Sequence, residues 1–181
     1  MPFFRSLPED AGVRHILALN KPAGRALIQF HEALLRGDSP LAPAQLELIA
    51  AYVSGLNACH YCYGVHAQTA AAYGIDPALL EALLQDVESA PVDAALRPIL
   101  RYARKLTLSP SRITQADADA VLAAGWPERA LHDAVLTIGL FNFMNRLLEG
   151  HGCKGAPEVF ATRGRALKDE GYAPLLKLLT G

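Results

Sequence analysis

The sequence is poor in cysteine, and this scarcity limits the classes of protein that it can represent. Only three of the 181 residues are cysteine, an odd number that argues against the paired disulfide framework of a secreted protein. The first residues also lack the basic start, apolar run and small-residue cleavage site of a secretory signal. We therefore expect a protein of the reducing cytoplasm.

An excess of charge of either sign is absent as well. The chain has 17 Lys and Arg residues against 18 Asp and Glu residues, a formal net charge of −1, and no long block of one sign. Proteins that bind nucleic acids or anionic membranes carry basic patches, so this balance predicts neither partner. With 51% hydrophobic residues, a chain of this length can bury a core of ordinary size.

The most pronounced local absence is that of charged residues between Leu48 and Ile75. Glu47 opens this segment, which we expect to be buried in a core or in a subunit interface. A membrane span is not predicted, because polar residues interrupt the segment throughout. The slightly positive mean hydropathy instead indicates that some apolar surface is covered between subunits.

Strand signals are missing too, since no segment alternates apolar and polar residues between hairpin turns. Ala and Leu outnumber the β-branched residues, and apolar positions recur at intervals of three and four, so the sequence predicts an all-α fold. We expect a single domain, 1–181, with a core of about 20–152 and a helical tail of about 157–181. Start and stop signals predict helices at 20–37, 43–56, 61–74, 76–84, 93–106 with a bend at Pro98, 114–125 and 127–150, then an amphipathic segment at 165–179 that packs across a neighbour.

Thiol chemistry is indicated by Cys59 and Cys62, which stand three residues apart at the expected start of a helix. A helix N-terminus and a CxxC pair both lower the pKa of a cysteine from its reference of about 8.5. His66 lies one helical turn after Cys62 on the same face, within reach of its proton, and Cys59 can close a disulfide with Cys62. The helix dipole favours Cys59 as the activated thiol, whereas the histidine spacing favours Cys62, and we follow the histidine.

Two other interpretations of the cysteines stay open. The pair can be half of a structural zinc site completed by His66, or by His151 and Cys153. Cys59, Cys62 and His66 would then form a non-enzymatic zinc-binding or redox-switch module. Alternatively, the cysteines pack as small hydrophobic residues without reactivity.

Several polar residues near the cysteines and elsewhere carry their own hypotheses. Glu47 can act on His66 in a proton relay or support a helix N-terminus from solvent, and its spacing favours neither role. His60 can tune the thiols or fill a turn. The remaining expectations are that His31 and His132 lie at the surface, and that Asn142, Asn145 and Arg146 are hydrogen-bonded inside the protein or across a subunit contact.

The spacing of these residues resembles that of a known family. A glutamate, a serine, a CxxC pair and a histidine at these intervals are the pattern of the alkylhydroperoxidase AhpD-like branch of the carboxymuconolactone decarboxylase superfamily. Here the pattern is met by Glu47, Ser54, Cys59, Cys62 and His66. The segment NFMNR at 142–146 resembles the peroxidase-related members in particular, and the likeness extends from about residue 20 to about residue 152.

The resemblance implies an all-α fold, assembly into homotrimers or homohexamers, and a thiol peroxidase that uses no metal, haem or other cofactor. Its substrates would be alkyl hydroperoxides, and its reductant an external dithiol or redox protein, such as a lipoyl-bearing one. By the same resemblance Cys62 is the peroxidatic cysteine, Cys59 the resolving one and His66 the base. Glu47 is then the partner of His66 in a proton relay, and Ser54 supports the site.

One position departs from the family pattern. The best-known peroxidase of the family has a histidine directly before the second cysteine, where this chain has Tyr61, with His60 one place earlier. The substitution removes one proton-relay group, although many peroxidase-related members share the tyrosine. We therefore expect His60 and Tyr61 to support the site rather than to react.

Overall fold

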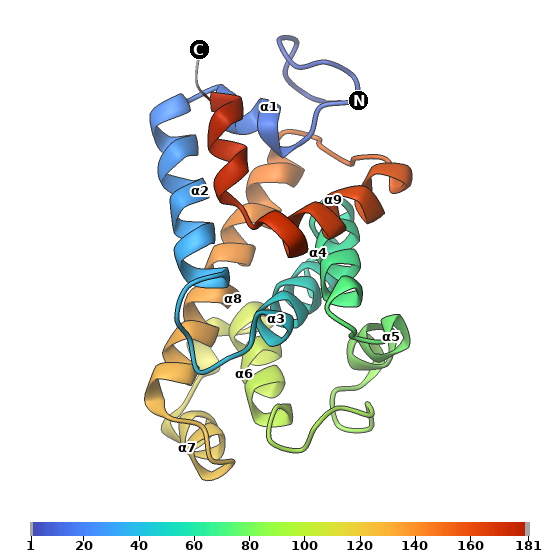
Figure 1. The fold of residues 1–181 in the computed structure, drawn as a ribbon. Helices are drawn as coiled ribbons and strands as arrows, with labels where there is room; N and C mark the ends of the chain where they lie inside the picture. The colour runs from blue at the N-terminus through green and yellow to red at the C-terminus, as the bar shows by residue number, and fades with distance from the viewer. Residues whose placement is uncertain (1, 180–181) are drawn as a thin grey trace.

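Helices make up all of the regular structure in residues 2–179, the part of the chain that the computed structural model describes (Figure 1). The predicted all-α class is therefore confirmed. The α-helices are α1 (Val13–Ala18), α2 (Lys21–Leu35), α3 (Pro43–Leu56), α4 (His60–Ala72), α5 (Pro77–Gln85), α6 (Arg97–Leu108), α7 (Gln115–Ala123), α8 (Glu128–Gly150) and α9 (Pro157–Glu170). Two 3-10 helices, η1 (Pro110–Arg112) and η2 (Ala173–Leu179), complete the set.

Capping residues explain where several predicted helices begin. The Asn20 side chain accepts the N–H of Ala23 at the start of α2, and the Asp76 side chain caps α5 in the same way. At α7, the Asp117 carboxylate accepts the N–H of Thr114, as expected for a capping pair. Each of these side chains satisfies a backbone donor that the helix itself leaves unpaired.

Two helices begin at other residues than predicted. Residues 94–96 form a turn, and α6 begins only at Arg97, so Pro98 lies in the first turn and starts the helix instead of bending it. Pro157 starts α9 in the same way, well before residue 165, and Gly171 with its positive φ follows the end of that helix. The amphipathic tail is therefore two helical pieces, α9 and η2.

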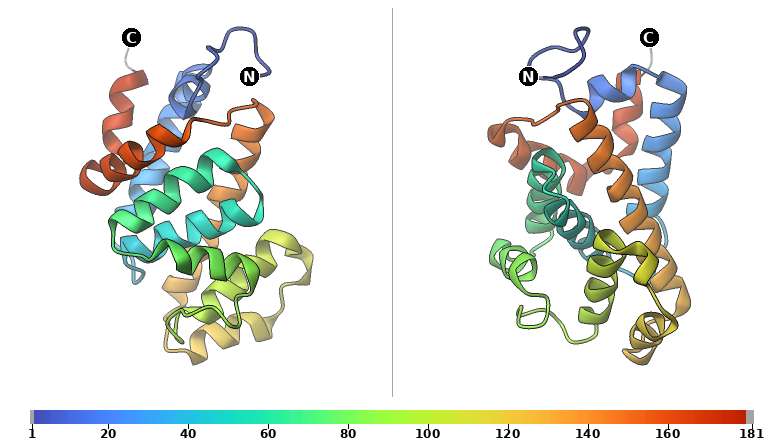
Figure 2. Two further views of the ribbon diagram at one scale, coloured as in Figure 1. Left: turned by 90° about the vertical axis from the view of Figure 1, so that its right-hand side faces the viewer. Right: turned by 180° about the vertical axis from the view of Figure 1, so that it is seen from behind.

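The site is built around a helical hairpin formed by α3 and α4. Both helices lie side by side, with α9 across α4 (Figure 2). The connecting turn is tight: Ala58 has a φ of 53°, a left-handed conformation that residues other than glycine rarely adopt. The N–H of Cys59 donates to the carbonyl of Ser54 within this turn. The hairpin thus places Cys59 at the N-cap of α4 and Cys62 in its first turn.

Small residues allow α9 to approach α4 closely. A β-carbon at Gly164 would lie 2.7 Å from a backbone carbon of Gln68, and one at Gly64 would lie 2.3 Å from the ring of Phe160. Side chains at either position would force the helices apart. We call residues 157–179 the C-terminal segment; after crossing α4 it continues as η2 against α1 and α2 of its own chain.

The segment without charged residues is buried where it forms α3, as its composition predicts. Every residue of α3 from Leu46 to Ser54 is buried, including Glu47. One hydrophobic core takes in buried residues from Ile16 to Leu179. No helix within residues 2–179 is both long and apolar enough to cross a membrane. The single domain 1–181 stays a prediction, and residues 1, 180 and 181 of it lie outside the described residues.

Candidate active site

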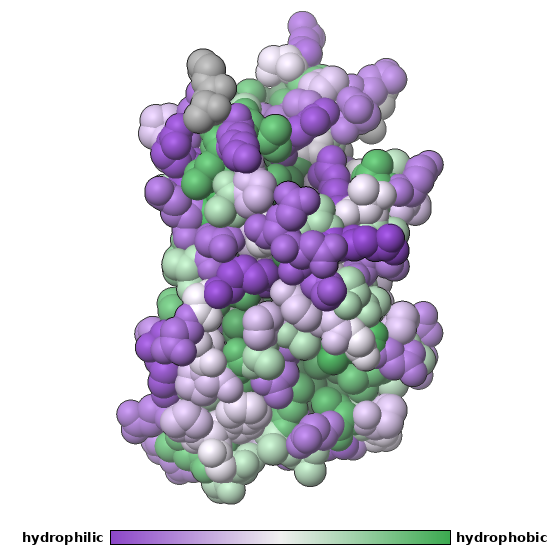
Figure 3. All heavy atoms as spheres, viewed as in Figure 1, coloured by the Kyte–Doolittle hydropathy of each residue, from purple (hydrophilic) through white to green (hydrophobic). Residues whose placement is uncertain are grey.

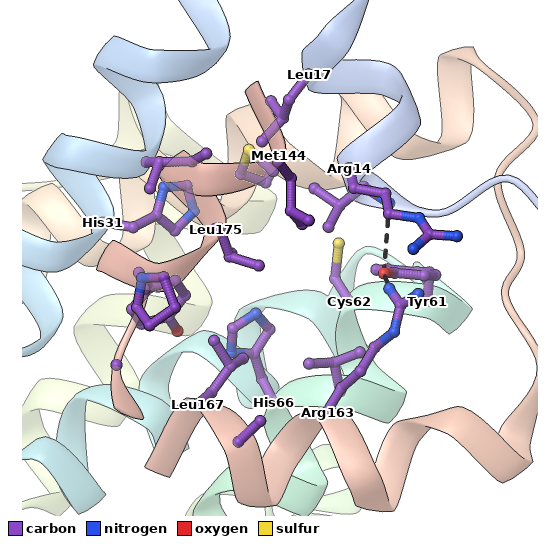
Figure 4. A pocket seen from close by; sticks show the side chains of 18 of the residues that line it. Arg14, Leu17, His31, Tyr61, Cys62, His66, Met144, Arg163, Leu167 and Leu175 are labelled. Atoms are coloured by element: carbon purple, nitrogen blue, oxygen red, sulfur yellow. Dashed lines mark hydrogen bonds between the residues drawn. The ribbon is translucent and has the colours of Figure 1, made fainter. Parts of the chain in front are cut away.

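A cavity of about 400 Å³ lies between α4, α8 and the C-terminal segment (Figure 4). This volume falls within the range of about 300–1,000 Å³ that is typical of small-molecule sites. Its walls are mostly apolar and include Leu17, Ile28, Val65, Phe141, Met144 and Leu175. Its polar groups include His31, Tyr61, Cys62, His66 and Arg163, so the cavity brings one cysteine and one histidine of the sequence pattern together.

The two cysteines of the CxxC pair differ in their access to this cavity. Cys62 lines the cavity, whereas Cys59 is completely buried and does not. Both are free thiols. A molecule bound in the cavity therefore meets the sulfur of Cys62.

The two thiols also differ in acidity, and the thiol without access to the cavity is the more acidic one. Hydrogen bonding to Cys62, including its backbone N–H, lowers the pKa of Cys59 against the effect of burial. The same contact with Cys59, together with burial, raises the pKa of Cys62 well above its ordinary value. Cys59, at the helix N-terminus, is therefore the more acidic of the two thiols, while the thiol that faces the cavity is Cys62.

His66 is held by the buried carboxylate of Glu47. Its Nδ1 lies 2.7 Å from Oε2 of Glu47, which is fully buried. Burial raises the pKa of Glu47, but the charges and hydrogen bonds of His66 and Arg36 outweigh it and hold that pKa below its usual value. An ionised carboxylate only accepts hydrogen bonds, so Nδ1 of His66 carries a proton and donates it in a hydrogen bond to Glu47, and in the neutral form of the ring Nε2 is the acceptor. The ring of Phe141 packs edge-on against the imidazole, with ring centres 4.4 Å apart.

Two further residues that the sequence analysis missed hold Glu47 in place. Oε1 of Glu47 accepts hydrogen bonds from the Arg36 guanidinium at 2.6 Å and from the Tyr172 hydroxyl at 2.9 Å. Arg36 also donates to the carbonyl of Leu167 in α9. Burial, and then the charge of Glu47, raise the pKa of Tyr172 well above its ordinary value, so the phenol keeps its proton. Glu47 is therefore neither solvated nor free to move.

A chain of polar side chains connects Ser54 to the thiol of Cys62. The Ser54 hydroxyl donates to the carbonyl of Ala50 and accepts from Nδ2 of Asn145 at 3.0 Å. Hydrogen bonding to Asn145 also lowers the pKa of Cys62, against the larger effects that raise it. Asn57 donates to Oδ1 of Asn145 at 2.9 Å and thereby fixes the amide. The expectation of an internal hydrogen bond is confirmed for Asn145, and its placement beside Cys62 is new.

The two residues between the cysteines point to different places. His60 is exposed, and its Nδ1 donates to the carbonyl of Lys154 at 3.0 Å, so it does not enter the cavity. Tyr61 lines the cavity, and its hydroxyl accepts hydrogen bonds from Arg163 and from the N–H of Val13. The structure thus brings Tyr61, but not His60, to the candidate site.

The surface position expected for His31 is wrong, whereas His132 is exposed as expected. His31 is only 6% exposed and lines the cavity, and its Nδ1 donates to the carbonyl of Leu27 at 2.7 Å. Burial lowers its pKa from 6.5 to about 4, so this imidazole is neutral near pH 7. His31 shares the apolar face of α2 with Ile28 and Leu35, a periodicity that its charged neighbours obscured.

A carboxylate approaches the buried cysteine from α8. The Oε1 atom of Glu149 is buried without a hydrogen-bond partner, while its other oxygen pairs with Lys154. The charge of Glu149 raises the pKa of Cys59, against the lowering effect of Cys62. Glu149 therefore influences the acidity of the thiol pair through Cys59.

The ligands of the alternative zinc site have other partners. The Cys153 thiol donates to the carbonyl of Ala11 at 2.7 Å, and Nδ1 of His151 donates to the carbonyl of Leu147 at the same distance. Burial raises the pKa of Cys153 to about 11. Between residues 2 and 179, no three His, Cys, Asp or Glu side chains are grouped in a way that could hold a metal ion.

The chain is similar to known proteins in both sequence and fold. Residues 21–105 match the model of the carboxymuconolactone decarboxylase family. A solved structure of an uncharacterized peroxidase-related protein from Silicibacter sp. TM1040 superposes with a TM-score of 0.76 at 29% sequence identity, covering 84% of this chain and 80% of that one. The chain is thus similar to the carboxymuconolactone decarboxylase family over residues 21–105, and its fold is similar to that of AhpD-like, peroxidase-related proteins.

A second AhpD-like structure agrees with this assignment. The protein from Ralstonia eutropha JMP134, described as an alkylhydroperoxidase AhpD core and an uncharacterized peroxidase-related protein, has a TM-score of 0.74 at 25% identity, covering 82% of this chain and 78% of that one. No curated protein matches the sequence. The resemblance expected from the residue pattern is confirmed, and the AhpD-like family supports a peroxidase-related role.

Proposed function

We propose that this AhpD-like protein is a thiol-dependent peroxidase that reduces alkyl hydroperoxides through a Cys59/Cys62 dithiol–disulfide cycle. The observation that carries the proposal is the cavity that Cys62 and His66 line together, with His66 oriented by the buried Glu47. An apolar cavity of this kind admits the hydrocarbon part of a hydroperoxide and excludes water from the reacting atoms.

The first step forms a sulfenic acid on Cys62. Nε2 of His66 takes the thiol proton, and the sulfur attacks the terminal oxygen of the hydroperoxide. The O–O bond breaks, and the alkoxide leaves with the proton that His66 returns, so one alcohol and one Cys62 sulfenic acid are formed. The sulfur supplies the two electrons that reduce the peroxide.

The unequal acidity of the thiols has a role in this step. The pKa of Cys59 is lowered and that of Cys62 is raised, so Cys62 keeps its proton longer than Cys59 does. Transfer of the Cys62 proton to His66 forms an imidazolium and places a negative charge on the sulfur that faces the cavity. The Asn145 amide, which hydrogen-bonds to Cys62, stabilises the charge there. Cys62 is thus the nucleophile because of its access and partners, although its resting pKa is high.

The second step closes the disulfide. The Cys59 sulfur attacks the sulfur of the Cys62 sulfenic acid, hydroxide leaves and takes a proton as water, and a Cys59–Cys62 bond forms. Two electrons and two protons from an external dithiol then restore the thiols through a mixed disulfide. Because Cys62 is reached only through the cavity, a slender dithiol such as a lipoyl group on a carrier protein suits this step.

Assembly into a homotrimer or homohexamer belongs to the same proposal. Large apolar side chains are exposed on α2, α6 and α8, among them Phe30, Leu108 and Phe143. Figure 3 shows a further gathering of hydrophobic residues on one face, between α5 and α6, below the hydrophilic band along α9. Contacts between subunits would cover such surface. Light scattering coupled to size-exclusion chromatography measures the mass directly, and a monomer at micromolar concentration would contradict this part.

The test of the cycle follows thiol oxidation in the reduced, chelator-treated protein. We expect a slight excess of cumene hydroperoxide to produce a rapid Cys59–Cys62 disulfide, located by peptide mass spectrometry. Cys62→Ser should abolish peroxide consumption. Cys59→Ser should still form one sulfenic acid on Cys62, which dimedone traps, but no disulfide. Cys153→Ser is the matched control, because its thiol lies outside the cavity, and it should behave like the wild type.

Two outcomes would overturn the proposal. Equal loss of the first oxidation in Cys59→Ser and Cys62→Ser would remove the assignment of Cys62 as the attacking thiol. Absence of rapid oxidation in the wild type, together with stoichiometric zinc in the untreated protein, would favour a non-enzymatic metal site on the same residues.

A further inference from the structure

Two arginines border the cavity at one end. Arg14 comes from α1 and Arg163 from α9, and both lie beside Tyr61 (Figure 4). The Arg163 guanidinium donates to the Tyr61 hydroxyl, and its central carbon lies 5.5 Å from the centre of that ring. Neither arginine takes part in any ion pair found within residues 2–179. Two positive charges therefore meet at the cavity without a carboxylate bound to either.

The electrostatics of this corner favour an anion. Burial, and then the positive charge of Arg14, lower the pKa of Arg163, while Asp10 acts more weakly in the opposite direction. Arginine stays charged in proteins, so the guanidinium remains positive in spite of these effects. A negatively charged group between the two arginines would relieve both the burial and the repulsion.

Tyr61 adds a third donor at the same place. Its oxygen already accepts hydrogen bonds from Arg163 and from the N–H of Val13. A phenol oxygen has two acceptor positions and one proton to give, so the Tyr61 O–H is left to donate. The residue that replaces a histidine of the family pattern thus contributes to an anion-binding corner.

The rest of the cavity has the opposite character. In Figure 4, Cys62 lies between the corner formed by Arg14, Tyr61 and Arg163 and the apolar part around Leu175. Among the described residues that line the cavity, the one carboxylate is that of Glu170, seven residues after Arg163 and therefore about 10 Å further along α9. The positive corner and the carboxylate lie at separate ends, so the cavity matches a ligand with one anionic group and a hydrocarbon body.

We propose that the cavity binds hydroperoxides that carry a carboxylate on a hydrocarbon chain, of the fatty-acid type. Arg14 and Arg163 hold the carboxylate, with a hydrogen bond from Tyr61, and the apolar walls cover the chain. The hydroperoxide group then meets Cys62 between them. Guanidinium groups match carboxylates in geometry and bind them with charge-assisted hydrogen bonds. This inference rests on the proposed peroxidase function and adds the class of substrate.

The test compares linoleic acid hydroperoxide with its methyl ester, below the concentration at which either forms micelles. The two compounds have the same hydrocarbon chain and the same hydroperoxide group, and only the acid carries a negative charge. We expect the acid to oxidise Cys62 in the wild type about tenfold faster or more, because a charged hydrogen bond contributes that much binding. Arg14→Gln and Arg163→Gln should each bring the ratio of the two rates close to one. Arg165→Gln, an exposed neighbour on α9, is the matched control and should keep the wild-type ratio.

The ratio of the acid rate to the ester rate is taken within each variant, because a general loss of activity lowers both rates and leaves their ratio unchanged. Equal rates for acid and ester in the wild type would overturn the inference and leave the peroxidase proposal intact. A preference for the acid that survives in both Arg14→Gln and Arg163→Gln would overturn it as well. Failure of acid, ester and cumene hydroperoxide alike to oxidise Cys62 would instead overturn the peroxidase proposal itself.

Discussion

Glu47 and His66 form a buried pair in which a 2.7 Å hydrogen bond joins the carboxylate to Nδ1 of the imidazole. The pair lies between α3 and α4, and its carboxylate is shared with Arg36 and Tyr172. This arrangement fixes both the orientation and the tautomer of the ring, because Nδ1 donates its N–H in a hydrogen bond to the carboxylate. A base that is oriented before the substrate arrives needs no rearrangement during proton transfer.

Replacing Glu47 tests that relationship. Glu47→Gln keeps the shape of the side chain but removes the charge that stabilises a protonated His66. We expect the first oxidation of Cys62 to slow about 100-fold, the lower range of the contribution of a general base. The free energy of unfolding should fall by about 3 kcal/mol, because Arg36 loses its buried partner. Rapid-mixing measurements of thiol loss and urea denaturation check the two effects.

The control for this variant is Glu128→Gln, which neutralises an exposed carboxylate in the first turn of α8. It should change neither the oxidation rate nor the stability appreciably. An unchanged oxidation rate in Glu47→Gln, over the whole pH range in which the protein is folded, would remove the relay from the mechanism.

His31 makes a prediction about stability and pH. Burial lowers its pKa from 6.5 to about 4, so between these values the unfolded chain binds more protons than the folded one. Stability is therefore complete above about pH 6.5 and falls as the pH falls through this window. From the two pKa values we expect a loss of about 2 kcal/mol between about pH 7 and about pH 5. Urea denaturation at both pH values measures it.

Two substitutions separate this effect from other titrations. His31→Gln removes the titrating group and should reduce the loss of stability between the two pH values. His132→Gln, at an exposed position, should leave the loss as in the wild type. The same pH dependence in His31→Gln and the wild type would show that His31 is not the group responsible.

Glu149 is expected to control the acidity of Cys59. Its charge raises the pKa of this thiol, so Glu149→Gln should lower that pKa further and increase the thiolate fraction near pH 7. Titration of the thiolate absorbance in the ultraviolet, in a Cys153→Ser background, measures the shift. Glu158→Gln, an exposed carboxylate in the first turn of α9, is the control. A titration curve that moves to higher pH in Glu149→Gln would contradict the interpretation.

Asn145 is expected to act on the other thiol. Asn145→Asp replaces a hydrogen-bond donor beside Cys62 by a carboxylate, so the pKa of Cys62 should rise further. The first oxidation should slow about tenfold near pH 7, the effect of losing one charge-assisted hydrogen bond. Asn142→Asp is the matched control one turn earlier on α8, where the amide binds Asn57 and Thr107 instead of the thiol. Similar slowing in both variants would indicate a structural effect.

The sequence could predict those parts of the site that depend on local spacing. The interval between Cys62 and His66 places them on one face of a helix, and the expected helix start places both cysteines at its N-terminus, where the structure has Cys59 as the N-cap. Proline and capping residues likewise predict most helix starts. These inferences succeed because the geometry of a single helix is fixed by hydrogen bonds within a few residues.

The partners of Glu47 show why the rest could not be predicted. Tyr172 stands 125 residues away in the sequence, and its hydroxyl reaches Glu47 only because η2 returns over α2. Arg36 follows the end of α2 and carries no signal of burial. The predicted surface position of His31 was wrong because its charged neighbours obscured its place on the apolar face of α2, which the cavity and Tyr172 cover. Long-range packing decides each of these cases.

The division of the cavity between two stretches of chain has an evolutionary consequence. Glu47, Cys59, Cys62 and His66 all lie within residues 21–105, the region that matches the family. Much of the opposite wall comes from the C-terminal segment, outside that region, and Glu32 anchors this segment by accepting the N–H groups of Tyr172 and Ala173. Under the proposed function, reactivity and selectivity are encoded separately, so mutation of the C-terminal segment would change the choice of peroxide and leave the residues of the dithiol cycle unchanged.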